Sequence, residues 1–414
     1  MVLVAADHPW DRGLDRGGVL GRRTLALKFD KPFTQQEPIP EPAIERAVEI
    51  LRSGRLHRYN TVVGEVAEAS LLEADYAAYQ GVPYCLATTS GGTALQIALR
   101  AMGLKPDEPV LTNAYTLAPV PGAIFASGGR PVLVDTLPDW TLDQAHLAEQ
   151  ARASGARLLL LSHMRGHLTD MTALMQLCGE LGVQVIEDCA HTMGAKWAGV
   201  QSGNFGAVAC FSTQTYKHIN SGEGGLLTTS DPEIAARAVI LSGSYMLYDR
   251  HGASPDEEVF ARVKTQAPNC SSRLDNLRAA LVRGQLANLD ANIQRWNDRY
   301  AALEAGLEGQ RAFQTRRIPE EELHVGSSFQ FHYLGGDVPA FVSRCADRGV
   351  ELKWFGAAQP AAFTSRYDSW HYLGDLPRLP RTEAVLATTC DIRVPLTFSV
   401  DDCQQIAEIL IDCA

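Results

Sequence analysis

Short apolar segments alternate with segments of helical spacing from residue 84 to residue 231, and this alternation constrains the fold more than any other feature. The apolar segments are expected strands, and they read "YCLAT", "PVLTN", "RPVLVDT", "ARLLLLS", "VQVIED", "AVACFST" and "GGLLTTSD". Residues 93–103, 120–129 and 170–182 lie between them and have the apolar spacing of helices. Apolar strands that alternate with helices are typical of a parallel sheet covered on both faces. We therefore expect an α/β fold that binds its ligands at the carboxyl ends of the strands.

The chain has 414 residues, which is too long for one simple core and predicts two or three domains. Residues 1–30 are rich in Gly, Arg and Asp with little periodicity, and we interpret them as an N-terminal arm. Residues 31–285 are expected to form the large domain, which begins with amphipathic helices at 41–56 and 68–81. Residues 286–414 are expected to form a smaller α+β domain that a long helix links to the large one.

Charge and cysteine content exclude several classes of protein. A net charge of −11 argues against nucleic acid or an anionic membrane as a partner. The nine cysteines are odd in number and none has CxxC spacing, which predicts reduced thiols in a cytoplasmic protein. The sequence predicts neither a signal peptide nor a transmembrane helix, and no feature points to a metal site.

One lysine, Lys217, stands in an unusual setting. It follows the apolar segment 207–211 after a hydroxyl-rich loop, and a Gly-Glu-Gly-Gly turn comes after it. Burial there would lower the pKa of the amine and leave it neutral for imine formation. Ser212 could donate to a cofactor phosphate, and the glycines would let backbone approach closely.

A carboxylate is expected at the end of a neighbouring strand. Asp188 ends the apolar segment "VQVIED", where a buried acid needs a partner. One interpretation is an aspartate that caps the next turn. The other is the acid that binds the protonated ring nitrogen of pyridoxal 5′-phosphate (PLP). His191 could face the hydroxyl side of such a ring or be an ordinary core histidine.

Two further segments suit the same cofactor. Gly91 and Gly92 lie where a strand gives way to a helix, so free N–H groups and the helix dipole could bind a phosphate there, with Ser90 and Thr93 as hydroxyl donors. The alternative is only a tight turn. Tyr115 follows the next strand and could stack on a flat ring or pack in the core.

Taken together, these stretches resemble the fold type I PLP aminotransferases of the DegT/StrS class, which aminate keto sugars and cyclitols. The similarity covers about residues 40–290, and the pairing of Asp-x-x-His with Lys-x-x-x-x-Gly-Glu-Gly-Gly is its most specific part. The resemblance implies a large domain with a mostly parallel seven-stranded sheet between helices and a smaller C-terminal domain. It also implies a homodimer with active sites at the interface.

By position, the resemblance implies a role for each candidate. Lys217 would be the Schiff-base lysine and proton shuttle, Asp188 the partner of the pyridinium, and His191 the residue that faces the ring hydroxyl. Tyr115 would stack on the ring. The phosphate would be bound by Gly91, Gly92 and Ser212.

The chain departs from the family at two places. The family commonly has Asn-x-Arg before the long helix, with the Asn reaching the partner subunit's phosphate. Here Ser271 takes that place and Asn269 lies two residues before it. Arg165 stands where an aromatic residue is usual, which puts the usual nucleotide-sugar substrate in doubt.

Transamination requires a group that binds the carboxylate of the amino donor, and arginine is the natural device. Arg58 and Arg165 are the candidates, and either could instead be solvated or ion-paired. Tyr216 and His218 flank the lysine and could line the substrate pocket.

We therefore predict a PLP-dependent aminotransferase that moves an amino group from an amino acid, glutamate or glutamine, to a keto sugar, cyclitol or other carbonyl acceptor. The alternatives are another PLP reaction, such as that of a lyase, decarboxylase or dehydratase, and a non-catalytic protein of the same fold that regulates a pathway. The sequence leaves the acceptor open.

Overall fold

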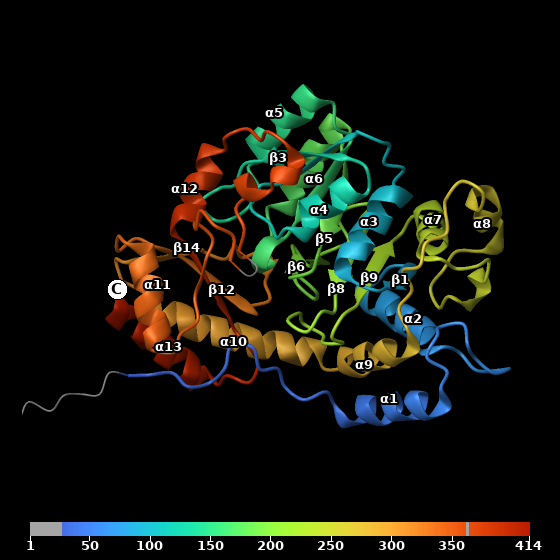
Figure 1. The fold of residues 1–414 in the computed structure, drawn as a ribbon, viewed down its shortest axis with the longest axis horizontal. Helices are drawn as coiled ribbons and strands as arrows, with labels where there is room; N and C mark the ends of the chain where they lie inside the picture. The colour runs from blue at the N-terminus through green and yellow to red at the C-terminus, as the bar shows by residue number, and fades with distance from the viewer. Residues whose placement is uncertain (1–26, 362–363) are drawn as a thin grey trace, which may run out of the picture.

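The computed structural model of the chain describes residues 27–361 and 364–414. The predicted arm at 1–30 therefore lies almost wholly outside the described residues. The described chain has a large part built on a seven-stranded sheet and a smaller part built on a four-stranded sheet (Figure 1).

The seven-stranded sheet has the order β1-β9-β8-β5-β4-β2-β3. β9 is antiparallel to both of its neighbours, and all other neighbouring pairs are parallel. The expected mostly parallel sheet is therefore confirmed. Its strands are β1 (Tyr84–Thr88), β2 (Pro109–Asn113), β3 (Arg130–Val134), β4 (Leu158–Ser162), β5 (Gln184–Asp188), β8 (Val208–Ser212) and β9 (Gly225–Thr229).

Helices cover both faces of this sheet. In β4, Leu158 and Leu160 belong to the core on one face, and Leu159 and Leu161 belong to the core on the other. This explains why the strands are apolar throughout rather than alternating. One face packs against α2 (Glu68–Gln80), α5 (Gln144–Ser154), α6 (Met171–Leu181) and α9 (Asn276–Leu286). The other packs against α3 (Gly91–Ala101), α4 (Pro119–Ala126), α7 (Pro232–Ser242) and α8 (Glu257–Val263).

The smaller part is an antiparallel sheet of order β10-β12-β14-β13 with its own apolar core. Its strands are β10 (Phe313–Thr315), β12 (Ser328–Tyr333), β13 (Lys353–Trp354) and β14 (Thr389–Arg393), and its helices are α10 (Leu289–Leu307), α11 (Val338–Asp347), α12 (Pro380–Thr388) and α13 (Val400–Cys413). A third, small sheet consists of β11 (Glu322–Leu323), β6 (Lys196–Trp197) and β7 (Val200–Gln201). Short 3-10 helices cover Met164–Gly166, Tyr248–Arg250, Tyr367–Ser369 and His371–Leu373.

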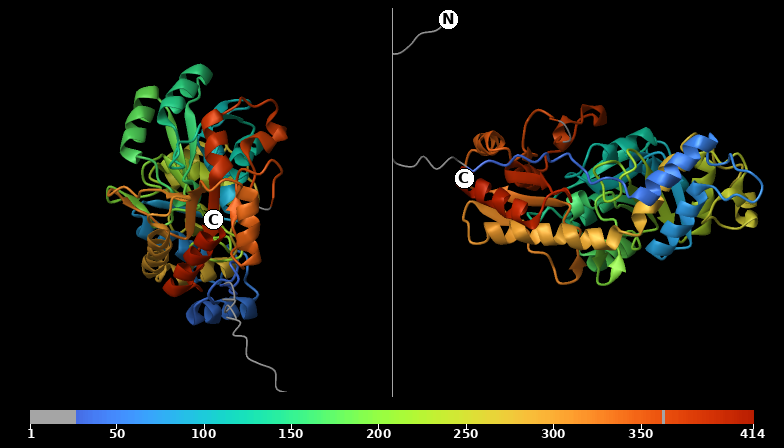
Figure 2. Two further views of the ribbon diagram at one scale, coloured as in Figure 1. Left: turned by 90° about the vertical axis from the view of Figure 1, so that its left-hand side faces the viewer. Right: turned by 90° about the horizontal axis from the view of Figure 1, so that it is seen from below.

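The predicted linking helix is two helices. The helical run over 274–307 breaks at Ala287 and Asn288, between α9 and α10. α9 packs on the large part, and α10 runs along the smaller one against α13 (Figure 2). The predicted boundary between 285 and 286 falls at the end of α9, and the division into domains there stays a prediction. Among the described helices, none is both long and apolar enough to cross a membrane.

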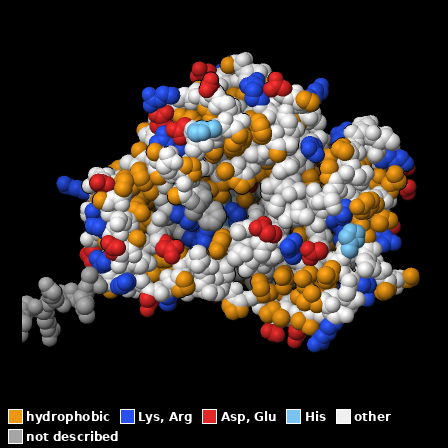
Figure 3. All heavy atoms as spheres, viewed as in Figure 1, with side chains coloured by type: hydrophobic (Ala, Val, Ile, Leu, Met, Phe, Trp, Pro, Cys, Tyr) orange, Lys and Arg blue, Asp and Glu red, His pale blue; other side chains and the backbone are white. Residues whose placement is uncertain are grey.

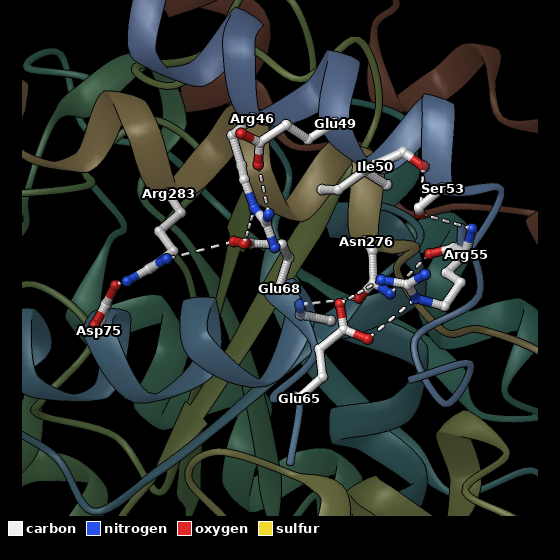
Figure 4. Close-up of polar contacts among 11 residues, drawn as sticks. Arg46, Glu49, Ile50, Ser53, Arg55, Glu65, Glu68, Asp75, Asn276 and Arg283 are labelled. Atoms are coloured by element: carbon white, nitrogen blue, oxygen red, sulfur yellow. Dashed lines mark hydrogen bonds and ion pairs between the residues drawn. The ribbon is translucent and has the colours of Figure 1, made fainter. Parts of the chain in front are cut away.

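Helix α1 (Glu41–Ser53) packs on α9 beside the large part. A Cβ added to Gly284 would lie 2.4 Å from the Cβ of Ala43, so this glycine is what lets the two helices approach so closely. Ion pairs surround the contact, as Figure 4 shows: Arg46 pairs with Glu68 at 2.5 Å, and Arg283 pairs with Glu68 at 3.4 Å. Glu68, the first residue of α2, therefore forms ion pairs with both α1 and α9.

Candidate active site

A cavity of about 440 Å³ lies where β1, β4, β5 and β8 end and the smaller part faces the large one. Ser90, Ser162, Asp188 and Ser212 line it from the large sheet, and Arg393 lines it from β14. Lys and Arg side chains gather in a hollow between the two parts (Figure 3). Hollows of about 740 and 760 Å³ lie elsewhere on the surface and contain none of the predicted catalytic residues.

Glycines bring two backbone segments together at one corner of the cavity. A Cβ on Gly91 would lie 2.8 Å from the Cβ of Ser212, and a Cβ on Gly225 would lie 2.4 Å from the carbonyl carbon of Ser90. Ser90 caps α3, because its Oγ accepts a hydrogen bond from the Thr93 amide at 3.0 Å. The start of α3 and the Ser212 hydroxyl thus meet at one point, which suits the binding of a phosphate. The predicted close approach at the Gly-Glu-Gly-Gly turn is confirmed.

Lys217 lies beside His191 in this cavity. A hydrogen bond of 2.7 Å joins Lys217 Nζ to His191 Nε2. Burial first, and then the positive charge of Arg165, lower the pKa of Lys217 to about 7. Burial and the same lysine hold the pKa of His191 well below its usual value, so its ring is neutral. The amine can therefore be neutral near neutral pH, as imine formation requires.

Asp188 has a buried carboxylate with few partners. It accepts hydrogen bonds from the Ala190 amide at 3.1 Å and from the Ser162 hydroxyl at 3.4 Å. It forms no ion pair with any described Lys, Arg or His, and burial raises its pKa. A cationic ring N–H would supply the partner that this acid lacks. Together with the phosphate corner and Lys217, this shows that the residues present fit PLP.

Arg165 lines the cavity and is only partly neutralised. Its backbone has a φ of 58°, a left-handed conformation that is costly for a residue other than glycine. Its Nη2 lies 3.1 Å from Asp391 Oδ2, but neither Nε nor Nη2 makes a hydrogen bond with proper geometry. Two donor nitrogens of this guanidinium thus have no hydrogen-bond acceptor within the described chain.

Tyr216 lines the cavity as well, beside a residue that the sequence interpretation missed. The guanidinium carbon of Arg393 lies 3.8 Å from the centre of the Tyr216 ring. The signal for Arg393 was available, because Asp391 and Arg393 alternate with Cys390 and Ile392, which belong to the core of the smaller part. Apolar lining residues were missed too, namely Leu95, Leu117, Pro119 and Met164.

The structure does not bring Arg58 to the cavity. Its side chain is buried against α2, where it donates two hydrogen bonds to Glu73, of 2.7 and 2.8 Å. The physical reason is that a buried charge requires a partner, and Glu73 supplies it within the large part. The prediction that Arg58 binds substrate therefore finds no support in its position.

Tyr115 is also not among the residues that line the cavity. Its hydroxyl contacts Gln330 of β12, and its ring packs edge-on against Phe355 at 5.2 Å. Contacts with residues of the smaller part thus hold the Tyr115 ring at a place that is not on the cavity lining. Leu117, two residues later, lines the cavity instead.

Three other predicted residues are not among those that line the cavity. Thr93 contacts the Ser90 hydroxyl at 2.9 Å. Ser271 accepts a hydrogen bond of 2.8 Å from Arg273, and its contact with a partner subunit stays a prediction. His218 contacts the Ser327 hydroxyl at 2.9 Å, and burial together with Lys217 lowers its pKa to about 3.

Comparison with known proteins agrees with this geometry. The dTDP-3-amino-3,4,6-trideoxy-alpha-D-glucose transaminase of Streptomyces venezuelae is 35% identical over 236 residues, which are 56% of this chain and 57% of that protein. The L-glutamine:2-deoxy-scyllo-inosose aminotransferase of Micromonospora echinospora is 28% identical over 292 residues, 68% of each chain. The solved structure of DesV from S. venezuelae has a TM-score of 0.75 and 27% identity, and the match covers 89% of this chain and 93% of that one.

The first of these matches spans little more than half the length of the relative. A sequence model of the DegT/DnrJ/EryC1/StrS aminotransferase family, however, matches residues 39–411, almost the whole chain. The chain therefore belongs to the DegT/DnrJ/EryC1/StrS aminotransferase family.

Proposed function

We propose that this protein is a PLP-dependent aminotransferase that takes an amino group from an amino acid and gives it to a carbonyl compound. The observation that carries the proposal is the set of Lys217, His191 and Asp188 in one cavity, which the close approach of Gly91 and Ser212 also lines. Family membership over residues 39–411 supports it. When bound, the cofactor supplies the electron sink that makes the Cα proton of an amino acid acidic.

Each residue of the set has a task in this proposal. The Gly91 and Gly92 amides and the Ser212 hydroxyl would bind the phosphate, and Asp188 would hold the ring nitrogen protonated. Lys217 would hold the cofactor covalently and then move a proton at the substrate Cα. A pKa of about 7 suits this, because a group that both takes and gives a proton works best when its pKa is near the working pH.

Arg165 is the proposed contact for the carboxylate of the amino donor. It lines the same cavity as Lys217, and its Nε and Nη2 are free of hydrogen bonds. A guanidinium matches a carboxylate with two parallel hydrogen bonds. Glutamate and glutamine are the proposed donors, and a keto sugar, a cyclitol or another carbonyl compound is the proposed acceptor.

The test replaces Lys217 with Ala. Wild-type protein supplied with the cofactor should gain a visible absorbance band, and an amino donor should change it. Lys217→Ala should keep its fold but lose turnover by several orders of magnitude, since Lys217 is the one lysine among the described residues that line the cavity. Lys105→Ala, on an exposed turn after α3, should behave as wild type. Substantial turnover by Lys217→Ala, or no absorbance band in the wild type, would overturn the proposal.

We further propose a homodimer in the cytoplasm. Several apolar side chains are exposed along α1 and the segment that follows it, namely Leu51, Leu56, Val62, Val63 and Val66. An exposed group of this kind favours contact with a second subunit. The nine cysteines are all free, as suits a reducing compartment. Light scattering on the purified protein tests the dimer, and a mass of one chain would contradict it.

A further inference from the structure

Strand β14 presents a charged face to the cavity. Residues two apart on a strand point to the same side, so Asp391 and Arg393 share one face, while Cys390 and Ile392 lie in the core on the other. Lys353 of β13 is opposite Asp391 in the register and therefore lies on the same face. Arg165 approaches this face from the large part and pairs with Asp391 at 3.1 Å.

The charges in this cluster do not balance. Arg165 and Arg393 carry two positive charges, and Asp391 carries one negative charge. Asp391 is fully buried and also accepts a hydrogen bond from the Ser328 hydroxyl. Glu223 is a further acid on the cavity lining, but it is exposed and forms no ion pair with a described residue.

Arg393 is the cation of this cluster whose geometry is best explained by a ligand. It forms no ion pair with any described carboxylate, and its guanidinium lies over the Tyr216 ring at 3.8 Å. Burial first, and then the charge of Arg165, lower the pKa of Arg393, which means that its surroundings disfavour the charge it carries. An anion in the cavity would correct this imbalance.

Resting on the proposed function, we propose that Arg393 is a specificity-determining residue that binds a second carboxylate of the substrate, in addition to the one at Arg165. The cavity then suits a dicarboxylic substrate whose reacting carbon lies near Lys217, because both arginines line the same cavity as this lysine. The second carboxylate has two sources: the side chain of a donor such as glutamate, or an acid group on the acceptor. A neutral keto sugar would leave Arg393 without an anion.

Binding of unreactive acids tests this without turnover. Glutarate and butyrate have the same chain but differ by one carboxylate, and calorimetry gives their affinities for the cofactor-loaded enzyme. Wild type should bind glutarate at least about tenfold more tightly than butyrate. Arg393→Gln should bring the two affinities to within about twofold, and Arg393→Lys should keep part of the difference because it keeps the charge but loses the planar fork.

The matched control is Arg317→Gln, which changes an exposed arginine of the smaller part and should keep the wild-type ratio. Equal affinities in the wild type, or an unchanged ratio in Arg393→Gln, would overturn the proposal. If Arg393→Gln does not fold, the Arg393→Lys ratio decides, and a value equal to that of wild type overturns it.

Glutamate and glutamine then distinguish the two sources, because they have nearly the same shape and differ in the side-chain charge. Faster conversion of the cofactor by glutamate, lost in Arg393→Gln, assigns the second carboxylate to the donor. Equal rates together with a preference for glutarate assign it to the acceptor. If no amino acid changes the absorbance at all, the proposed function fails, whereas the glutarate ratio is measured independently of any reaction.

Discussion

Arg58 and Arg165 each face a carboxylate within the folded chain, yet their surroundings differ. Arg58 is 1% exposed and donates to both oxygens of Glu73, at 2.7 and 2.8 Å. Its Nη2 is also 3.0 Å from a ring nitrogen of His251. Arg165 has one ion pair with Asp391, makes no well-formed hydrogen bond through Nε or Nη2, and lines the cavity of Lys217.

This difference separates an arginine that holds the fold from one that we propose binds a ligand. The two terminal nitrogens of Arg58 are used within the protein, although its Nε is without a partner. Arg165 has unused donors at a cavity and a backbone held in the left-handed region. A protein tolerates both costs where another molecule completes the site.

The largest effect is expected from Arg58→Met. The change removes one partner of a buried pair and leaves the Glu73 carboxylate without its countercharge, which should lower the free energy of unfolding by about 3–5 kcal/mol. Denaturant unfolding measures it. Arg317→Met, at an exposed site, should change it by less than about 0.5 kcal/mol. A loss of less than about 1 kcal/mol for Arg58→Met would mean that the pair does not hold the fold.

Acid should weaken the same pair. Burial alone would raise the pKa of Glu73, but Arg58 and His251 outweigh it and hold that pKa well below its usual value. The pair therefore stabilises the fold fully above the unfolded pKa of a glutamate, and the stabilisation decreases as the pH falls toward the folded value. Comparing the acid unfolding of wild type with that of Arg58→Met checks this, since the variant should lose this part of the pH dependence.

Arg165→Gln should have the opposite profile. Loss of a charged hydrogen-bond partner for the donor carboxylate should slow conversion of the cofactor by glutamate by about 10–100-fold, or about 1.5–3 kcal/mol. The free energy of unfolding should fall by less than it does in Arg58→Met, because Asp391 keeps its contact with Ser328. Single-turnover absorbance measures the rate. An unchanged donor rate with a slower acceptor half-reaction would assign Arg165 to the acceptor instead.

The sequence was sufficient to predict the sheet and most of the polar residues that meet at the cavity. Apolar runs specified β4 and β5, and local chemistry placed Gly91, Asp188 and Lys217 at strand ends that a parallel sheet brings together. Arg58 and Arg165 could not be separated in this way, because both lie in short polar segments with no local partner that distinguishes them. The partner that decides between them, Glu73 for Arg58 and Asp391 for Arg165, comes from elsewhere in the chain.

Contacts between the two parts account for the remaining differences. Tyr115 follows β2 where a stacking aromatic was expected, but residues of the smaller part, Gln330 and Phe355, occupy its surroundings. Arg393 was missed because its role depends on how β14 faces the large part. Such contacts join residues more than 170 positions apart, and no local pattern encodes them.

The smallest expected effect concerns the pH at which Lys217 becomes reactive. The amine is neutral above its pKa, so the cofactor-free protein should take up PLP faster as the pH rises through about 7.

Burial is the larger cause of this low pKa, and the charge of Arg165 is the next. Arg165→Gln should therefore move the midpoint of the uptake rate to higher pH, but well short of the ordinary lysine value of 10.5. Arg58→Met should leave the midpoint where it is, because Arg58 is not among the main causes of this pKa and its charge is already paired with Glu73. If wild type and Arg165→Gln have the same midpoint, the charge of Arg165 does not affect the pKa of Lys217 and burial alone sets it. Arg58 and Arg165 would then differ in ligand contact but not in their effect on this pKa.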